Sequence, residues 1–255
     1  MFGLPLNASA HGHEIDYLIL LIHILMVVLF VGWGIYFVIA LFKFRKGANP
    51  KADYQGVKGH ASSFIEVAVV VIEAVLLIGF SIPFWAKHVN AFPNRTDTIE
   101  VRVVAEQFAW NVHYPGKDGI FGKSNPKLVD NQSNPIGIDS SDPNAADDII
   151  NINQLHLPIG KPAVIHLSSK DVIHSFAINA MRVKQDTIPG MSIKTWFTPV
   201  KTGKFDIGCA QLCGIGHYRM KGFLTVESPE DFEKWISEQS TVGSSSGGDA
   251  DSFWN

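Results

Sequence analysis

Both cysteines of the chain lie in one short segment that also holds a histidine and a methionine. The segment reads Gly208-Cys-Ala-Gln-Leu-Cys-Gly-Ile-Gly-His-Tyr-Arg-Met220, so His217 and Met220 stand four and seven residues after Cys213. Thiolate, imidazole and thioether are soft ligands that suit copper. Two thiolates can bridge two copper ions, and each ion then needs its own imidazole. The spacing therefore predicts a copper site built on this segment.

The second imidazole must come from another part of the chain, and His174 is the best candidate. It lies in Asp171-Val-Ile-His-Ser-Phe176, after a polar turn and at the start of a predicted strand. The alternatives are a Cys209–Cys213 disulfide, an ordinary core position for Met220, and a zinc site. Methionine is a poor zinc ligand. The cysteines, the histidine and the methionine together favour copper over the disulfide.

These residues must be positioned by a domain of short strands. Turn clusters separate runs rich in β-branched and aromatic residues, which is the pattern of an all-β sandwich or barrel. Residues 114–148 are rich in turn-forming residues and predict a long polar excursion without a core of its own, 229–237 predict a short helix, and 238–255 predict a flexible tail. The predicted strands are 99–104, 163–167, 173–178, 193–197, 204–207 and 223–226.

Two long apolar stretches precede this domain. The composition, with 46% hydrophobic and 18% charged residues, excludes a disordered chain, and a net charge of −3 argues against a nucleic-acid binder. Residues 17–42 and 64–86 are each long enough to cross the hydrocarbon core of a bilayer. We therefore expect two transmembrane helices. A cleaved signal peptide is the weaker interpretation of the first stretch, because residues 1–16 lack Lys and Arg.

The distribution of basic residues predicts the orientation of the two helices. Residues 43–63 contain five basic side chains, whereas the leader, 1–16, contains none. Because positive loops stay in the cytoplasm, we expect 43–63 to be cytoplasmic and both termini to lie outside, at a bacterial inner membrane. The five residues are Lys43, Arg45, Lys46, Lys51 and Lys58.

Two glutamates interrupt the second apolar stretch. Glu66 and Glu73 are seven residues apart, so they lie on one stripe of a helix. Charged groups inside a bilayer are costly and need partners. The stripe therefore predicts a neighbouring membrane subunit. Glu66 is a candidate for a proton path, whereas packing or hydrogen bonding against a partner helix is the favoured interpretation of Glu73.

With these features, the chain resembles subunit II of haem-copper cytochrome c oxidases. Three stretches carry the resemblance: 171–176, Arg182-Val-Lys-Gln-Asp-Thr-Ile-Pro-Gly190, and 209–220. The resemblance also covers the two apolar stretches. In the strand-rich domain it covers residues 99–110 and 151–226. It implies a transmembrane hairpin followed by a cupredoxin-like Greek-key sandwich, the copper domain, over 99–228.

The resemblance also implies a ligand set for a binuclear copper centre, called CuA in this family. Cys209 and Cys213 would bridge both coppers. His174 and Met220 would complete one copper, and His217 and the backbone carbonyl of Gln211 would complete the other.

The chain departs from the family pattern at several positions. Phe108 stands where the family usually has its electron-entry tryptophan, so Trp110 becomes the candidate for electron entry. Gln211 replaces a glutamate that often binds magnesium at the boundary with the catalytic subunit, and an amide is a weaker ligand for a hard cation. We therefore assign no magnesium. Val69 and Glu73 stand where Trp and Pro are common, while Glu66 matches a glutamate at a proton-channel mouth.

The implied function is electron transfer within a proton-pumping oxidase. Cytochrome c, or a membrane-bound c-type cytochrome, would reduce the copper centre, and electrons would pass to haem in subunit I, where oxygen is reduced. A quinol oxidase subunit is one alternative, but that class lacks the copper ligands. A membrane-tethered copper carrier or assembly module is the other, and the acidic stripe of the second helix counts against it.

Overall fold

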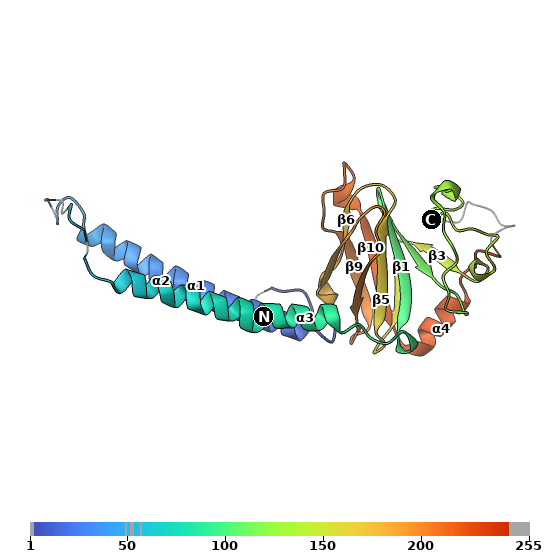
Figure 1. Ribbon diagram of the computed structural model, residues 1–255, viewed down its shortest axis with the longest axis horizontal. Helices are drawn as coiled ribbons and strands as arrows, with labels where there is room; N and C mark the ends of the chain where they lie inside the picture. The colour runs from blue at the N-terminus through green and yellow to red at the C-terminus, as the bar shows by residue number, and fades with distance from the viewer. Residues whose placement is uncertain (1–2, 49, 52–53, 57, 245–255) are drawn as a thin grey trace. The chain divides into compact units, whose positions relative to one another are not determined.

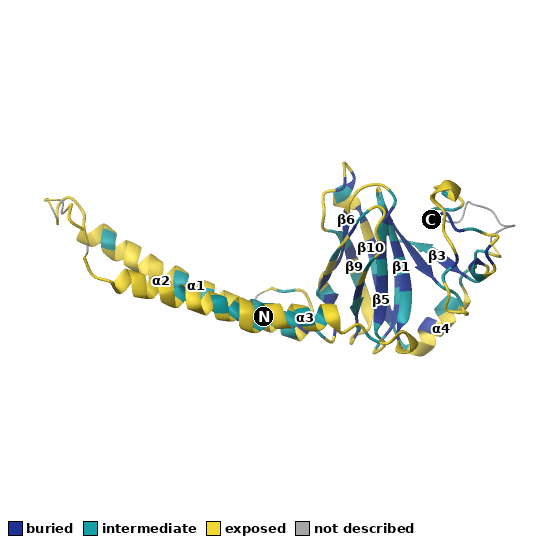
Figure 2. Cartoon of the chain, viewed as in Figure 1, coloured by how far each residue is buried: buried dark blue, intermediate teal, exposed yellow. Residues whose placement is uncertain are grey.

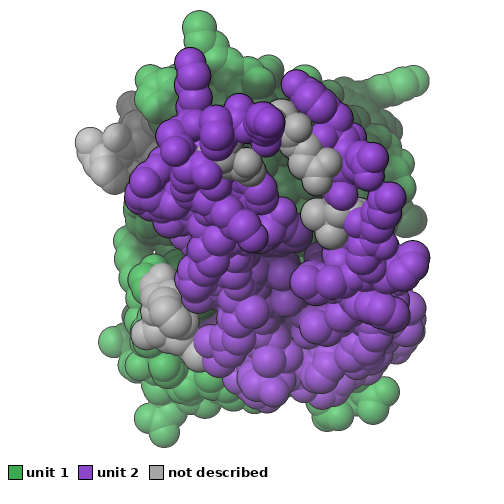
Figure 3. Space-filling model, turned by 90° about the vertical axis from the view of Figure 1, so that its left-hand side faces the viewer, with its two compact units in different colours: residues 1–12, 92–255 green, residues 13–91 purple. Residues whose placement is uncertain are grey.

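The computed structural model describes the whole chain except residues 1–2, 49, 52–53, 57 and 245–255. It divides into two compact units, which Figure 3 distinguishes by colour. One unit, residues 13–91, is helical. The other comprises residues 1–12 and 92–255 and holds the β domain.

The helical unit consists of two long apolar helices (Figure 1). Helix α1 spans Gly12–Lys43. The second is built from α2 (Ala61–Ala74), a π-helical segment η1 (Val75–Ser81) and α3 (Ile82–Asn90). Lys87 of α3 pairs with Glu14 in the first turn of α1. Both helices are long and apolar enough to cross a membrane.

Both helices are longer than the apolar stretches in the sequence. They begin several residues earlier, in polar segments, and the second also ends later. An acidic side chain near the start of a helix and basic side chains near its end interact favourably with the helix dipole. Glu14 and Lys87 occupy such positions. The side chains between them are mostly exposed (Figure 2), as expected for helices that face lipid or partner helices.

The β domain is a sandwich of two five-stranded sheets. The first has the strand order β3-β2-β1-β5-β8 and the second β4-β10-β9-β6-β7. The β-sandwich predicted from the sequence is thus confirmed. The strands are β1 (Ile99–Glu106), β2 (Ala109–Tyr114), β3 (Ile149–Ile152), β4 (Gln154–Pro158), β5 (Ala163–Ser169), β6 (His174–Ile178), β7 (Val183–Thr187), β8 (Ile193–Phe197), β9 (Gly203–Cys209) and β10 (Lys221–Glu227).

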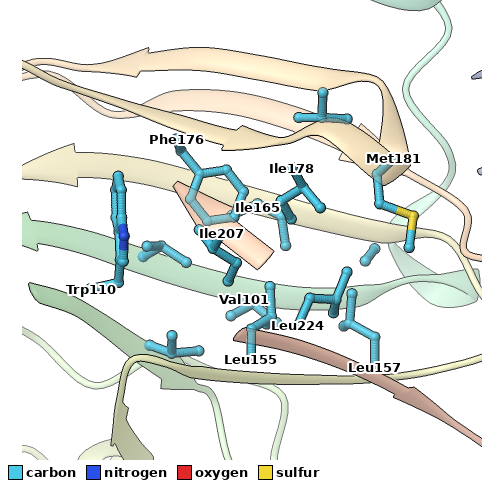
Figure 4. Close-up of a cluster of buried hydrophobic side chains, with 14 of the residues drawn as sticks. Val101, Trp110, Leu155, Leu157, Ile165, Phe176, Ile178, Met181, Ile207 and Leu224 are labelled. Carbon is cyan, nitrogen blue, oxygen red and sulfur yellow. The ribbon is translucent and has the colours of Figure 1, made fainter. Parts of the chain in front are cut away.

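The core lies between the two sheets (Figure 4). In β1, alternate residues are buried, so Val101, Val103 and Ala105 point inward. Phe176 and Leu224 reach the core from the second sheet. This alternation follows from the two-residue period of a strand. Helix α4 (Pro229–Ser237) occupies the predicted range and adds Phe232 to the core.

The excursion, 114–148, covers part of the outer face of the first sheet. Ile136, Ile138 and Ala145 form a second small cluster that packs against Val104 and Ile150. The segment thus lies in the same compact unit as the sandwich and packs a small apolar cluster onto the sheet. This cluster could not be predicted from the sequence, because the apolar residues of the excursion are few and are separated by turn residues.

One buried carboxylate fixes the end of the excursion. Asp148 accepts hydrogen bonds from His113 Nε2 at 2.7 Å and from the Gly122 amide at 2.9 Å. His113 and Asp148 have no exposed side-chain surface. Arg102, on β1, lies over the ring of Phe121 at 4.5 Å from its centroid. The excursion is thus attached to the sheet by polar as well as apolar contacts.

The leader and the start of the tail also belong to the β domain. The Ala8 amide donates to the Ala180 carbonyl, the Ala8 carbonyl accepts from Val200, and the Ala8 side chain is fully buried. Near the other end, Val242 and Gly243 donate to the carbonyls of the excursion. The predicted flexible tail is therefore wrong for 241–244, and 245–255 lie outside the described residues.

Candidate metal centre

Two loops at one end of the sandwich carry the predicted ligands. The loop from β5 to β6 ends at His174, the first residue of β6. The loop from β9 to β10, which we call the copper loop, begins at Cys209 and ends at Met220. Cys209 is paired with Phe176 across the two strands, so the sheet itself brings the loops together.

The structure brings the predicted donor atoms to one place. Cys213 lies at the centre, with its Sγ 3.8 Å from Cys209 Sγ, 3.6 Å from His217 Nδ1 and 3.8 Å from Met220 Sδ. The donor atoms of His174, Cys209 and Cys213 all lie within 4.8 Å of one another. Four side chains of the copper loop and the distant His174 thus converge on one small volume.

The sixth predicted ligand is a backbone oxygen. Cys209 Sγ lies 3.1 Å from the carbonyl oxygen of Gln211 and 4.0 Å from His174 Nδ1. Both cysteines are free thiols. Their Sγ–Sγ distance is nearly twice the roughly 2.05 Å of a disulfide.

The donor set suits copper bridged by thiolates. It offers two thiol sulfurs, two imidazoles and a thioether, which are the soft and borderline ligands that copper prefers, and one backbone carbonyl in addition. His174, Cys213 and Met220 are buried, whereas Cys209 and His217 are partly exposed. These residues fit a binuclear copper centre near the surface of the domain.

Asp171 orients one of the imidazoles. Its Oδ1 lies 2.8 Å from His174 Nε2, so the ring presents the other nitrogen, Nδ1, to the sulfurs. Partial burial by itself would raise the pKa of Asp171. Hydrogen bonds from His174, Gln107 and Val172 outweigh burial and lower that pKa below its usual value. The charged carboxylate is therefore the stable form beside this ligand.

The central thiol has the opposite tendency. Burial, with a further contribution from Cys209, raises the pKa of Cys213 to about 11. The neutral thiol is thus favoured at neutral pH when no cation is nearby. A bound metal ion stabilises the thiolate instead, so metal binding at this site must release a proton.

The two aromatic residues expected near the site differ in exposure. Trp110 is fully buried, with its ring edge-on to His174 at a centroid distance of 6.3 Å. Phe108 is partly exposed and lies against the copper loop, where a Cβ on Gly216 would be 2.4 Å from its ring. Trp110 thus contacts a predicted ligand residue, and Phe108 contacts the loop surface.

The surface of the copper loop is apolar. Leu212, Ile215 and Tyr218 are 79%, 94% and 87% exposed. A hollow of about 390 Å³ lies beside Cys209, His217 and Met220, and Asp206 and Lys221 also line it. Apolar side chains this exposed around a site are typical of a surface that docks a partner.

Sequence reasoning named the residues that converge here but missed two of their supporting contacts. Asp171 stands three residues before His174, and a carboxylate near a ligand histidine is a recognisable signal. Gln107 donates to the carbonyl of Cys213 at 2.6 Å, and this contact has no local sequence signal because 106 residues separate the partners. The predicted proton-path residue, Glu66, belongs to the helical unit, on α2, where its side chain is exposed.

Comparison with known proteins gives a consistent result. The family described as "Cytochrome C oxidase subunit II, periplasmic domain" matches residues 99–227. The "Alternative cytochrome c oxidase subunit 2" of Bradyrhizobium diazoefficiens is 41% identical over 155 residues, which cover 60% of this chain and 56% of that protein. The "Probable cytochrome c oxidase subunit 2" of Rickettsia bellii is 28% identical over 222 residues, 85% of this chain and 75% of that one.

Among solved structures, the chain is similar to the periplasmic domain of subunit II of the Bradyrhizobium japonicum cytochrome oxidase. The TM-score is 0.42 at 27% identity, and the match covers 58% of this chain and 95% of that one.

Proposed function

Since the chain belongs to the cytochrome c oxidase subunit II family, we propose that it is the electron-accepting subunit of a proton-pumping oxidase. It would take electrons from cytochrome c, or from a membrane-bound c-type cytochrome, and pass them to haem in subunit I, where oxygen is reduced to water. The observation that carries this proposal is the convergence of two thiols, two imidazoles, a thioether and a carbonyl on one site.

Each residue of the site has its own role in holding the proposed copper pair. Cys209 and Cys213 would bridge two coppers, His174 and Met220 would complete one, and His217 with the Gln211 carbonyl would complete the other. When bound, such a copper pair would accept and release single electrons. The burial of Cys213, His174 and Met220 keeps water away from these donors.

A site held by two strands resists rearrangement, and this property suits electron transfer. His174 begins β6 and Cys209 ends β9, so hydrogen bonds of the sheet fix both ends of the ligand set. Ligands that do not move when an electron arrives lower the cost of the transfer. The complete donor set argues against a quinol oxidase subunit, which would not need it.

The exposed apolar side chains of the copper loop support docking of partner proteins. Leu212, Ile215 and Tyr218 lie on the same loop as His217, one of the predicted ligands, so a redox partner that covered them would come close to the site. For electron entry we propose the surface at Phe108 and the loop, followed by Trp110. Trp110 has no exposed surface and contacts His174.

We also propose that the 43–63 loop is cytoplasmic and that both termini lie on the periplasmic side of a bacterial inner membrane. The leader supports this orientation, because Ala8 and Ala10 are hydrogen-bonded to the β domain. A leader bound to that domain must lie on the same side of the membrane. The basic residues of the loop favour the cytoplasm independently.

Anaerobic rapid mixing tests the proposed function. A reduced c-type cytochrome is mixed with the copper-loaded full chain in detergent, and oxidation of the cytochrome is followed optically. We expect fast transfer to the wild type and none to Cys213→Ser. Transfer from a quinol but not from the cytochrome would contradict the proposal, and so would equal rates for the wild type and the variant.

A further inference from the structure

A two-residue turn between β1 and β2 lies against both ligand-bearing loops. The turn consists of Gln107 and Phe108, and Glu106 pairs with Ala109 at its base. None of the predicted metal ligands belongs to it. It nevertheless contacts residues of the β5–β6 loop and of the copper loop.

Gln107 makes one hydrogen bond to each of these loops. Its backbone amide donates to Asp171 Oδ2 at 2.7 Å, and the other oxygen of Asp171 bonds to His174. Its side-chain amide donates to the backbone carbonyl of Cys213 at 2.6 Å. A single residue therefore connects the support of one imidazole with the central thiol residue.

The copper loop is shaped to accept this contact. Gly214 has a φ of +134°, and a Cβ at that position would be 2.6 Å from Gln107 Nε2. A Cβ added to Gly216 would likewise be 2.4 Å from the ring of Phe108. Residues with side chains at 214 and 216 would separate the loop from the turn, so the two glycines are required for this close approach.

We propose that Gln107 is a positioning residue of the metal centre. Its side chain fixes the backbone at Cys213, and its amide, through Asp171, fixes the imidazole of His174. This inference rests on the proposed function in one respect, namely that the ligands bind copper. Its mechanical part, that Gln107 holds the copper loop in place, concerns the chain alone.

Substitution of the side chain tests the proposal in the full chain purified in detergent. Gln107→Met keeps the length of the side chain and removes the donor, and Gln107→Ala removes both. Gln132→Met is the matched control, because Gln132 is an exposed glutamine on the excursion. Copper affinity is measured by competition with a chelator, and access to the thiols is measured by alkylation of the metal-free chain.

We expect Gln107→Met and Gln107→Ala to bind copper about tenfold more weakly. Their thiols should be alkylated several-fold faster, while the control matches the wild type in both measurements. Wild-type copper affinity together with a wild-type alkylation rate in both variants would overturn the proposal. If one of the two variants does not fold, the measurements on the other variant decide whether Gln107 has the positioning role.

The two proposals fail in different ways. A wild-type chain that binds no copper pair would refute the proposed function, and the alkylation rates would then still decide whether Gln107 holds the loop. Normal copper binding in the wild type with unchanged variants would refute only the positioning role.

Discussion

At the scale of single residues, Cys213 is the point on which the site converges. Its sulfur is the neighbour of three other donor side chains, and its carbonyl accepts from Gln107. The thiol is buried and has a raised pKa. A residue in this environment is costly without a metal ion, because two thiols and a thioether crowd a site where they form only weak hydrogen bonds.

Gly216 offers a steric test of the copper loop. Its φ of −93° suits any residue, and the atoms nearest to a methyl group there belong to the Phe108 ring, the first at 2.4 Å. We expect Gly216→Ala to lower the free energy of unfolding by about 1–3 kcal/mol and to weaken copper binding. Chemical denaturation and copper titration measure both effects.

A second substitution and a control make this test specific. Phe108→Ala combined with Gly216→Ala should restore much of the copper binding, because the clashing ring is gone. Gly208→Ala should behave as the wild type, since a Cβ there meets nothing within 4 Å. Failure of the double variant to improve on Gly216→Ala would contradict the steric explanation.

The ligand residues could be predicted from the sequence because their chemistry is rare and their spacing is short. Cys209, Cys213, His217 and Met220 lie within one loop, and His174 was indicated by its position after a polar turn at the start of a predicted strand. The contact of Gln107 with Cys213 could not be predicted, because it depends on the turn between β1 and β2 meeting a loop 106 residues later. Contacts of this kind are set by the assembled sandwich.

At the scale of elements, polar residues explain why three of the strands were not predicted from the sequence. β2 contains Asn111 and His113, both fully buried, so its polar residues do not mark an exposed face. The excursion covers this strand and hides the usual alternation. β4 and β7 likewise contain polar residues that make them resemble loops: His156 in one, and Lys184, Gln185 and Asp186 in the other.

The leader provides a prediction about how elements join. Ala8 is fully buried within the β domain, whereas Ala10 is exposed. Ala8→Glu places an unpaired carboxylate in the core, so we expect the free energy of unfolding to fall by at least about 2 kcal/mol. Ala10→Glu should change it by less than about 0.5 kcal/mol. Denaturation of the two variants side by side measures the difference, and equal stabilities would show that the leader does not pack on the domain.

The attachment of the excursion predicts a pH dependence. Burial lowers the pKa of His113 from its ordinary value near 6.5, although Asp148 opposes the shift and Arg102 adds to it. As the pH falls below that ordinary value, the unfolded chain takes up a proton that the folded chain refuses. Stability is therefore lost on the acid side, by up to about 1.4 kcal/mol per pH unit for this group.

Denaturation at pH 7 and pH 5 measures this contribution. The wild type should lose more stability between these values than His113→Gln, whose amide cannot take up the proton. His60→Gln, at an exposed histidine of the helical unit, should behave as the wild type. A loss in His113→Gln as large as in the wild type would assign the pH dependence to other groups.

At the scale of the whole molecule, the chain is a membrane protein with a periplasmic domain of the subunit II family, and we propose that two of its surfaces contact partner proteins. The exposed apolar residues of the copper loop are one such surface. The exposed glutamates of α2, Glu66 and Glu73, are the proposed second surface, on a helix that is apolar enough to cross a membrane. Both features fit a subunit of a larger complex.

The acidic stripe predicts the effect of neutralising each glutamate in the assembled oxidase. Glu66→Gln removes a carboxyl group that could carry protons, so we expect oxygen consumption to slow several-fold while the copper content stays unchanged. Glu73→Gln is the matched control and should be close to the wild type. Undiminished turnover in Glu66→Gln would rule out its proton role.

The central claim is that this chain holds a pair of coppers bridged by Cys209 and Cys213. Copper analysis of the full chain combined with electron-paramagnetic resonance tests it most directly. The account predicts two coppers per chain and the hyperfine pattern of one unpaired electron shared by two copper nuclei, both lost in Cys213→Ser. No bound copper, or the spectrum of a single isolated copper, would contradict it.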